Sequence, residues 1–188
     1  MSFENLGLRP ELVKALKGMG IEKPTQIQEK TFPLIAKGSD VIGISKTGSG
    51  KTAAFSLPLL HNLTHAHSVQ IMVLGPTREL VVQIAKQMEL FGRYQHVNVA
   101  SVYGGVGIVP QIDQIKRSQV VVGTPGRVLD HLSRGTLSLG HIKTIVLDEA
   151  DKMVDMGFIT DIQRILDECP KQKQILLFGA TISEEINH

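Results

Sequence analysis

The residues best suited to chemistry form one glycine-rich loop: Ser45, Lys46, Thr47, Gly48, Ser49, Gly50, Lys51 and Thr52. Glycines let backbone N–H groups approach a phosphate chain closely, and a helix that begins where the loop ends adds positive potential. The Lys51 ammonium can then reach the outer phosphates, and the Thr52 hydroxyl can coordinate Mg²⁺. Ser45 stands where the usual motif opens with glycine. A turn of no function could have this composition, but the apolar run before the loop and the helical segment after it favour a phosphate site.

The sequence Asp148-Glu149-Ala150-Asp151 follows the apolar run 144–147 without a break. A buried strand of this kind ends at the edge of the sheet where α/β folds bind ligands. We expect Asp148 to face a Mg²⁺ held near Thr52, and Glu149 to orient or deprotonate the attacking water, with Lys51 as the third catalytic residue. An acidic strand end by itself is more typical of a helix N-cap. Together with the phosphate loop, it predicts ATP and Mg²⁺ as cofactors.

The elements that must position these residues alternate along the chain. Apolar runs rich in Val, Ile and Leu occur at 40–44, 70–74, 97–102, 119–123, 143–147 and 174–178, which is typical of parallel strands buried on both faces. Segments with helical spacing lie at 51–63, 78–91 and 159–168. This order predicts an α/β domain with a mostly parallel central sheet and helices on both faces. The first 37 residues contain short helical segments but no strand, and we expect them to pack over one edge or end of the sheet.

Composition indicates a single globular domain but excludes few classes of function. The chain has 188 residues, 42% of them hydrophobic, and a formal net charge of +2, which is too small to indicate a polyanion partner. No apolar run is long enough to span a membrane, and no signal peptide is visible. The single cysteine, Cys169, is expected to pack in the core and is compatible with a cytoplasmic protein.

The two motifs and the segments between them resemble the DEAD-box helicase family over nearly the whole chain. The acidic sequence 148–151 carries the family name. The segments that resemble the other family motifs are the Q motif at Pro24, Thr25, Gln26, Ile27 and Gln28, motif Ia at Pro76, Thr77, Arg78, Glu79 and Leu80, the GG motif at Gly104 and Gly105, and motif Ib at Thr124, Pro125, Gly126 and Arg127. The resemblance implies a RecA-like P-loop domain at 38–188, with a Q-motif region at 1–37 packed on it.

The Q motif implies recognition of adenine. Gln28 matches the glutamine that reads the adenine edge in the family, and its amide can both donate and accept a hydrogen bond as that edge requires. Phe3 matches an upstream aromatic residue that supports the adenine pocket. Phe3 could equally be a core residue, and the two roles are compatible.

The family contacts RNA through phosphates and sugars. By resemblance, the RNA-binding residues are Pro76, Thr77, Arg78, Gly104, Gly105, Thr124, Pro125, Gly126 and Arg127. Backbone contacts do not read sequence, so we expect single-stranded or short duplex RNA to bind with little sequence preference. Contact with the ribose 2′-OH would favour RNA over DNA. Either arginine, considered without its motif, could also be a salt-bridged surface residue.

The segment Gly179-Ala180-Thr181 departs from the family, which usually has Ser-Ala-Thr there. With Asp151, it resembles the part that couples the nucleotide site to the RNA site and to a second RecA-like domain. Because Gly179 has no hydroxyl, we expect ATP binding to survive but leave open whether hydrolysis stays coupled to strand separation.

The resemblance also implies a second RecA-like domain that brings arginine fingers, without which we expect hydrolysis by this chain to be very slow. The function that it implies is that of an ATP-dependent RNA helicase. An ATP-gated RNA clamp with weak unwinding stays open as an alternative. The Q motif and the acidic sequence argue against a DNA helicase or another P-loop ATPase.

Overall fold

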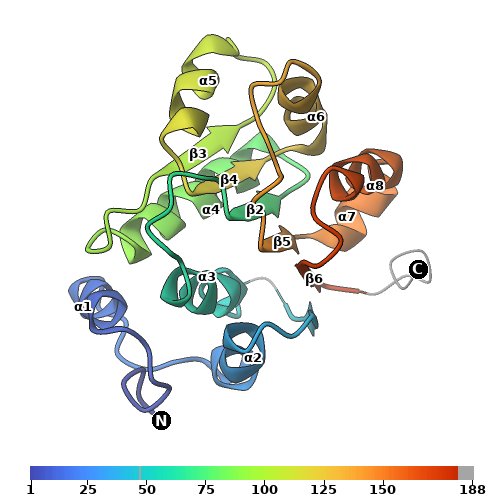
Figure 1. The fold of residues 1–188 in the computed structure, drawn as a ribbon. Helices are drawn as coiled ribbons and strands as arrows, with labels where there is room; N and C mark the ends of the chain where they lie inside the picture. The colour runs from blue at the N-terminus through green and yellow to red at the C-terminus, as the bar shows by residue number, and fades with distance from the viewer. Residues whose placement is uncertain (47, 182–188) are drawn as a thin grey trace.

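The computed structural model describes residues 1–46 and 48–181. Its centre is a six-stranded sheet with the order β1-β6-β5-β2-β4-β3 (Figure 1). Every pairing in it is parallel, which confirms the predicted α/β class. The strands are β1 (Val41–Ile44), β2 (Ile71–Leu74), β3 (Val99–Val102), β4 (Val120–Gly123), β5 (Thr144–Leu147) and β6 (Gln174–Gly179).

Helices connect the strands and cover the sheet (Figure 1). No described helix is both long and apolar enough to cross a membrane. The helices are α1 (Pro10–Gly18), α2 (Gln26–Ala36), α3 (Lys51–His61), α4 (Arg78–Phe91), α5 (Val109–Lys116), α6 (Pro125–Ser133), α7 (Ala150–Asp155) and α8 (Ile159–Asp167).

Alternate residues of the central strands enter two separate cores, because side chains of a strand point to opposite faces. Val73 of β2 packs in one cluster with side chains of α1 to α4, including Phe55. Its neighbour Met72 packs in the other cluster with side chains of α5 to α8, including Ile165. The central strands β2, β4 and β5 are buried on both faces for this reason, as their continuous apolar runs predict. The same prediction is wrong for β1, where Ile42 and Ile44 are 50% and 56% exposed at the edge of the sheet.

The N-terminal helices pack at one side of the sheet. Helix α2 lies against α3 and touches the edge strand β1, while α1 contacts α4. Phe3 and Leu12 belong to the same core cluster as the residues of α3. These contacts place the N-terminal helices against α3, α4 and the edge strand β1.

The strand order sorts the loops that carry the predicted motifs. Because all strands are parallel, the loops that follow them emerge at one edge of the sheet. The loops after β1, β6 and β5 occupy one half of this edge and carry the phosphate loop, the 179–181 segment and the acidic sequence. The loops after β2, β4 and β3 occupy the other half and carry motif Ia, motif Ib and the GG motif. Backbone hydrogen bonds keep neighbouring loops in register, for example from Ser45 N to Gly179 O at 3.1 Å.

Candidate functional site

The phosphate loop and the acidic sequence meet at the first half of the edge. Lys51 is the first residue of α3, and its Nζ lies 3.3 Å from Oδ1 of Asp148. Gly50, with φ of 82°, adopts the left-handed conformation that turns the loop into the helix. Thr52 is half-buried in the first turn of α3. Thr47 lies outside the described residues.

Three buried oxygen atoms in this region have no hydrogen-bond partner among the described residues: Ser45 Oγ, Ser49 Oγ and Asp148 Oδ2. Buried polar atoms in folded proteins are nearly always paired, so such a group of orphans calls for a ligand. Two hydroxyls suit phosphate oxygens, and a carboxylate oxygen suits a hard cation such as Mg²⁺. The donor set therefore fits Mg–ATP.

Asp148 is completely buried. Burial raises the pKa of this carboxyl, although the Lys51 ammonium and the Glu149 backbone N–H both act in the opposite direction. The charged form that a metal requires is therefore disfavoured until a further cation stands beside it.

Glu149 adopts a left-handed backbone conformation, with φ of 50°. This conformation is uncommon and strained for a residue with a side chain, and it often marks a functional position. It places Glu149 at the N-cap of α7, directly after Asp148, whose Oδ1 accepts a hydrogen bond from the Glu149 N–H at 2.9 Å. Its carboxylate is partly exposed and lies 3.4 Å from Lys152 Nζ.

Gln28 links the Q motif to the phosphate loop. It forms a capping box at the start of α2, in which its Oε1 accepts from Thr25 N at 3.0 Å. Its Nε2 donates to the carbonyl of Gly50 at 3.1 Å. Each of these side-chain atoms retains one further hydrogen-bonding position, which is what reading an adenine edge would require.

A cavity of about 500 Å³ lies beside this link, between the start of α2, β1 and the phosphate loop, and Thr25, Ile27, Ser45 and Ser49 are among its lining residues. Phe3 is only 2% exposed and is a core residue, while its role beside adenine stays a prediction.

Asp151 holds the end of β6. Its Oδ2 accepts hydrogen bonds from Ala180 N, Thr181 N and the Thr181 hydroxyl at 3.2–3.3 Å. A Cβ atom on Gly179 would lie 2.9 Å from Asp151 Oδ1, so the glycine gives the carboxylate its room. Burial opposes ionisation of Asp151, but the hydrogen bonds outweigh it and hold the pKa of this carboxyl below its usual value. Two backbone amides and the Thr181 hydroxyl thus bind Asp151, without any side chain at residue 179.

The second half of the edge carries exposed groups that suit a nucleic-acid backbone. Arg78 is exposed at the start of α4, with its guanidinium 4.9 Å from the centre of the Tyr103 ring. Gly104 and Gly126 are exposed, and a Cβ atom on either would meet nothing within 4 Å. Packing therefore gives no reason for glycine at these two positions, whereas close approach of a ligand does.

The remaining predicted RNA ligands have structural roles as well. Thr77 caps α4 by accepting from Leu80 N at 3.2 Å. Thr124 is the N-cap residue of α6 but forms no such side-chain bond. Pro76 and Pro125 are buried, so they shape the loops beneath the exposed groups.

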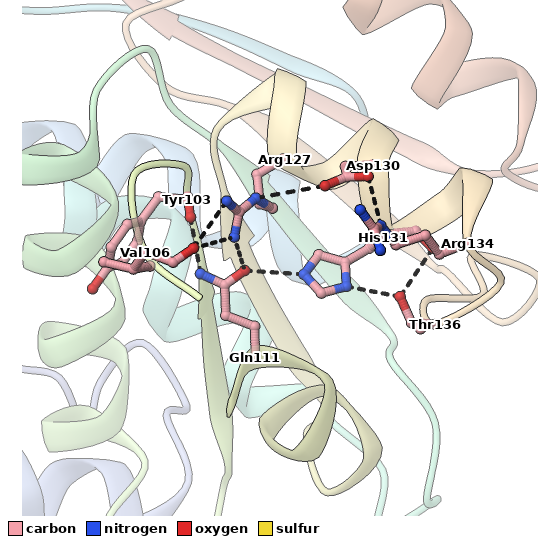
Figure 2. Close-up of polar contacts among 8 residues, drawn as sticks. All are labelled: Tyr103, Val106, Gln111, Arg127, Asp130, His131, Arg134 and Thr136. Atoms are coloured by element: carbon pink, nitrogen blue, oxygen red, sulfur yellow. Dashed lines mark hydrogen bonds and ion pairs between the residues drawn. The ribbon is translucent and has the colours of Figure 1, made fainter. Parts of the chain in front are cut away.

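Arg127 differs from Arg78 because its guanidinium faces the protein (Figure 2). Its Nη1 and Nη2 both donate to the carbonyl of Val106 at 3.1 Å, and Nη1 also donates to Gln111 Oε1 at 3.2 Å. Gln111 in turn lies beside His131. Gln111 and His131 were not predicted, because a glutamine and a histidine outside any motif give no signal in the sequence.

Comparison with known proteins agrees with this arrangement. The family model for DEAD/DEAH box helicases matches residues 25–188. A protein named ATP-dependent RNA helicase CshA, from Listeria monocytogenes, is 49% identical over 98% of this chain, which is 36% of the relative. ATP-dependent RNA helicase DeaD from Buchnera aphidicola is 50% identical over 98% of this chain, which is 31% of that relative. This chain thus spans about a third of the length of these two proteins.

Solved structures show the same fold. The crystal structure of a DEAD box protein from Methanococcus jannaschii matches with a TM-score of 0.96 at 44% sequence identity. The match covers 100% of this chain and 52% of that chain.

Proposed function

This chain belongs to the DEAD/DEAH box helicase family, and we propose that it is the part of an ATP-dependent RNA helicase that binds Mg–ATP and the backbone of single-stranded RNA. One observation carries the proposal. One half of a single sheet edge carries the buried oxygen atoms without hydrogen-bond partners, which suit phosphate and a metal ion. The other half carries the exposed Arg78 and the exposed glycines. Nucleotide and RNA can therefore bind side by side on one rigid element.

In the nucleotide half, Lys51 binds the outer phosphates, and Ser45, Ser49 and the loop backbone bind the phosphate chain. Thr52 and Asp148 would hold Mg²⁺, which supplies charge neutralisation between the phosphates. Glu149 positions the attacking water and accepts its proton. Gln28 selects adenine, and its bond to Gly50 O connects that selection to the phosphate loop.

In the RNA half, Arg78 neutralises a phosphate, and the Thr77 and Thr124 hydroxyls bind phosphate or ribose oxygens. Gly104, Gly105 and Gly126 let the strand approach the backbone. Little sequence preference is expected from such contacts.

A second RecA-like domain of the same protein completes both sites and supplies the cations for the transition state. Asp151 lies in the nucleotide half and binds the end of β6. The segment 179–181 is therefore the proposed route by which the nucleotide half acts on that domain.

The test is made with the full-length protein. Its ATPase activity should rise with single-stranded RNA and much less with single-stranded DNA of equal length, and it should separate a short RNA duplex. ATPase without stimulation by RNA would contradict the proposal. RNA-stimulated ATPase without strand separation would instead identify an ATP-gated clamp, which the names of the relatives do not favour.

A further inference from the structure

A buried chain of hydrogen bonds lies beneath the GG loop, residues 103–106 (Figure 2). His131 of α6 is 0% exposed and Gln111 of α5 is 4% exposed. His131 Nε2 lies 3.0 Å from Gln111 Oε1, and Gln111 Nε2 donates to the carbonyl of Tyr103 at 2.9 Å. These hydrogen bonds therefore join two helices, α5 and α6, to the loop that carries Gly104 and Gly105.

The neighbours of Gln111 determine the protonation of His131. Arg127 Nη1 must face an acceptor and the carbonyl of Tyr103 must face a donor, so the orientation of the Gln111 amide is fixed. His131 must then carry its proton on Nε2 and donate to Gln111 Oε1. On the other side of the ring, Nδ1 lies 2.8 Å from the hydroxyl of Thr136, which also lies 3.1 Å from the His131 carbonyl. That carbonyl already accepts from the Thr136 backbone N–H at 3.0 Å, so the hydroxyl proton can be donated to Nδ1. All polar atoms of the buried pair are thereby satisfied with a neutral imidazole.

Each end of the GG loop is held by one side chain that takes part in these hydrogen bonds. Gln111 holds the carbonyl of Tyr103, which precedes the glycine pair, and Arg127 holds the carbonyl of Val106, which follows it. The Arg127 side chain is only 14% exposed, and its Nε faces Asp130 Oδ2 at 3.8 Å. Its guanidinium is thus largely occupied by protein acceptors.

Arg78 presents the opposite case. It is exposed, forms no ion pair with any described residue, and rests on the Tyr103 ring on the outer side of the same loop. One arginine of the RNA half is therefore free for a phosphate, and the other is not.

We propose that Gln111, His131 and Arg127 are positioning residues that hold the GG loop and the start of α6 in the arrangement that binds RNA, and that Arg127 does not neutralise a phosphate. This inference rests on the proposed function, because it concerns the RNA track of that same site. It separates two arginines that both lie in the first turn of a helix and in a segment that resembles an RNA-binding motif.

Salt dependence distinguishes a phosphate ligand from a positioning residue. RNA affinity of the full-length protein with a non-hydrolysable ATP analogue is measured from about 50 to about 200 mM salt. Arg78→Gln should weaken binding and reduce the slope of log K against log salt by about 1. Arg127→Gln should weaken binding roughly tenfold and leave the slope unchanged. A loss of slope for Arg127→Gln equal to that for Arg78→Gln would overturn the inference.

The buried pair has a matched control on its own helix. Gln111→Met removes the amide from the buried face of α5, and Gln114→Met makes the same change at an exposed position of that helix. Gln111→Met should lower RNA affinity roughly tenfold, with the salt slope and the affinity for the ATP analogue unchanged, and Gln114→Met should change none of these. The double variant Gln111→Met/His131→Leu should lose no more affinity than the stronger single variant, because both substitutions interrupt the same series of hydrogen bonds.

The outcomes separate the inference from the function on which it rests. No RNA binding by the unchanged protein would overturn the proposed function. RNA binding that Gln111→Met and Gln114→Met alter equally would overturn the inference alone. A lost thermal transition would show that Gln111→Met fails to fold. In that case the salt dependence of RNA binding by Arg127→Gln still tests the inference.

Discussion

The Lys51 ammonium and the Asp148 carboxylate face one another at the carboxyl edge of the sheet, with Nζ 3.3 Å from Oδ1. Lys51 begins α3 after the phosphate loop, and Asp148 follows β5. Neither forms a second ion pair within the described part of the chain. The lysine does not fully offset the burial of its partner, since the pKa of Asp148 is raised. Ionisation of Asp148 is therefore unfavourable in the folded chain, and a bound cation would make it favourable.

The raised pKa of Asp148 predicts how Asp148→Asn changes stability with pH. A carboxyl whose pKa is higher in the folded chain stabilises the fold at low pH, and this contribution is lost as the pH rises from the ordinary value of 3.8 through the folded pKa. The amide variant does not titrate. Its thermal midpoint relative to the unchanged chain should therefore increase as the pH is raised from about 4 to about 7, measured without nucleotide. A difference independent of pH would contradict the raised pKa.

Asp151→Asn is the matched control with the opposite sign. The pKa of Asp151 is lowered, so its carboxylate stabilises the fold fully above the ordinary value of 3.8, and this contribution is lost as the pH falls through the folded pKa. The variant should be less stable than the unchanged chain at neutral pH, and the difference should shrink in acid. Mg²⁺-dependent nucleotide binding should be lost in Asp148→Asn and retained in Asp151→Asn.

Gln28→Ala should weaken ATP more than GTP, because only the adenine edge loses its partner. The structure adds a second effect. The variant also removes the bond to Gly50 O and half of the capping box, so GTP affinity should fall slightly too. Thr25→Ala removes the other half of the box and leaves the Gln28 amide in place, so it should weaken both nucleotides equally. Equal weakening of both nucleotides by Gln28→Ala would refute its role in adenine recognition.

The fold could be predicted from sequence because its signals are local. Continuous apolar runs predict all six strands to within two residues at either end, and the predicted helix at 78–91 matches α4. The helices α5, α6 and α7 were not predicted. Helix α5 (Val109–Lys116) has only 8 residues and buries only Gln111 and Ile115, so it offers few apolar positions from which to predict a helix.

The strand order and the contacts of the Arg127 guanidinium could not be predicted for a different reason. Which strands become neighbours depends on contacts far apart in the chain, and local patterns do not encode them. Arg78 and Arg127 each lie in a segment that resembles an RNA-binding motif. The difference between them comes from α5, which brings Gln111 to one arginine and not to the other.

Gly126→Ala should raise stability and lower RNA affinity together. Gly126 is exposed in the first turn of α6, and a Cβ atom there would meet nothing within 4 Å. Alanine should therefore stabilise the helix by about 0.5 kcal/mol, seen as a higher thermal midpoint. The methyl group would occupy the space through which an RNA strand approaches, so RNA affinity should fall while ATP affinity stays constant. Unchanged RNA affinity would remove Gly126 from the proposed RNA track.

Gly179 offers a test of coupling. A Cβ atom there would lie 2.9 Å from Asp151 Oδ1, so Gly179→Ala must displace a carboxylate that accepts from Ala180 and Thr181. We expect a loss of about 1–2 kcal/mol in the free energy of unfolding, and a fall in the duplex separated per ATP hydrolysed by the full-length protein. Gly140→Ala, at an exposed glycine whose Cβ has room, should change neither.

Gly179→Ser separates crowding from the lost hydroxyl contact. It introduces the same Cβ atom together with a hydroxyl that can donate to the displaced Asp151 carboxylate. If the backbone contacts of Asp151 replace the usual serine, Gly179→Ser should recover much of the coupling that Gly179→Ala loses without exceeding that of the unchanged protein. Coupling clearly above the unchanged protein would mean that Gly179 impairs strand separation and that Asp151 does not compensate for it. Equal coupling in all three proteins would mean that the contact between Asp151 and the end of β6 does not transmit the state of the nucleotide.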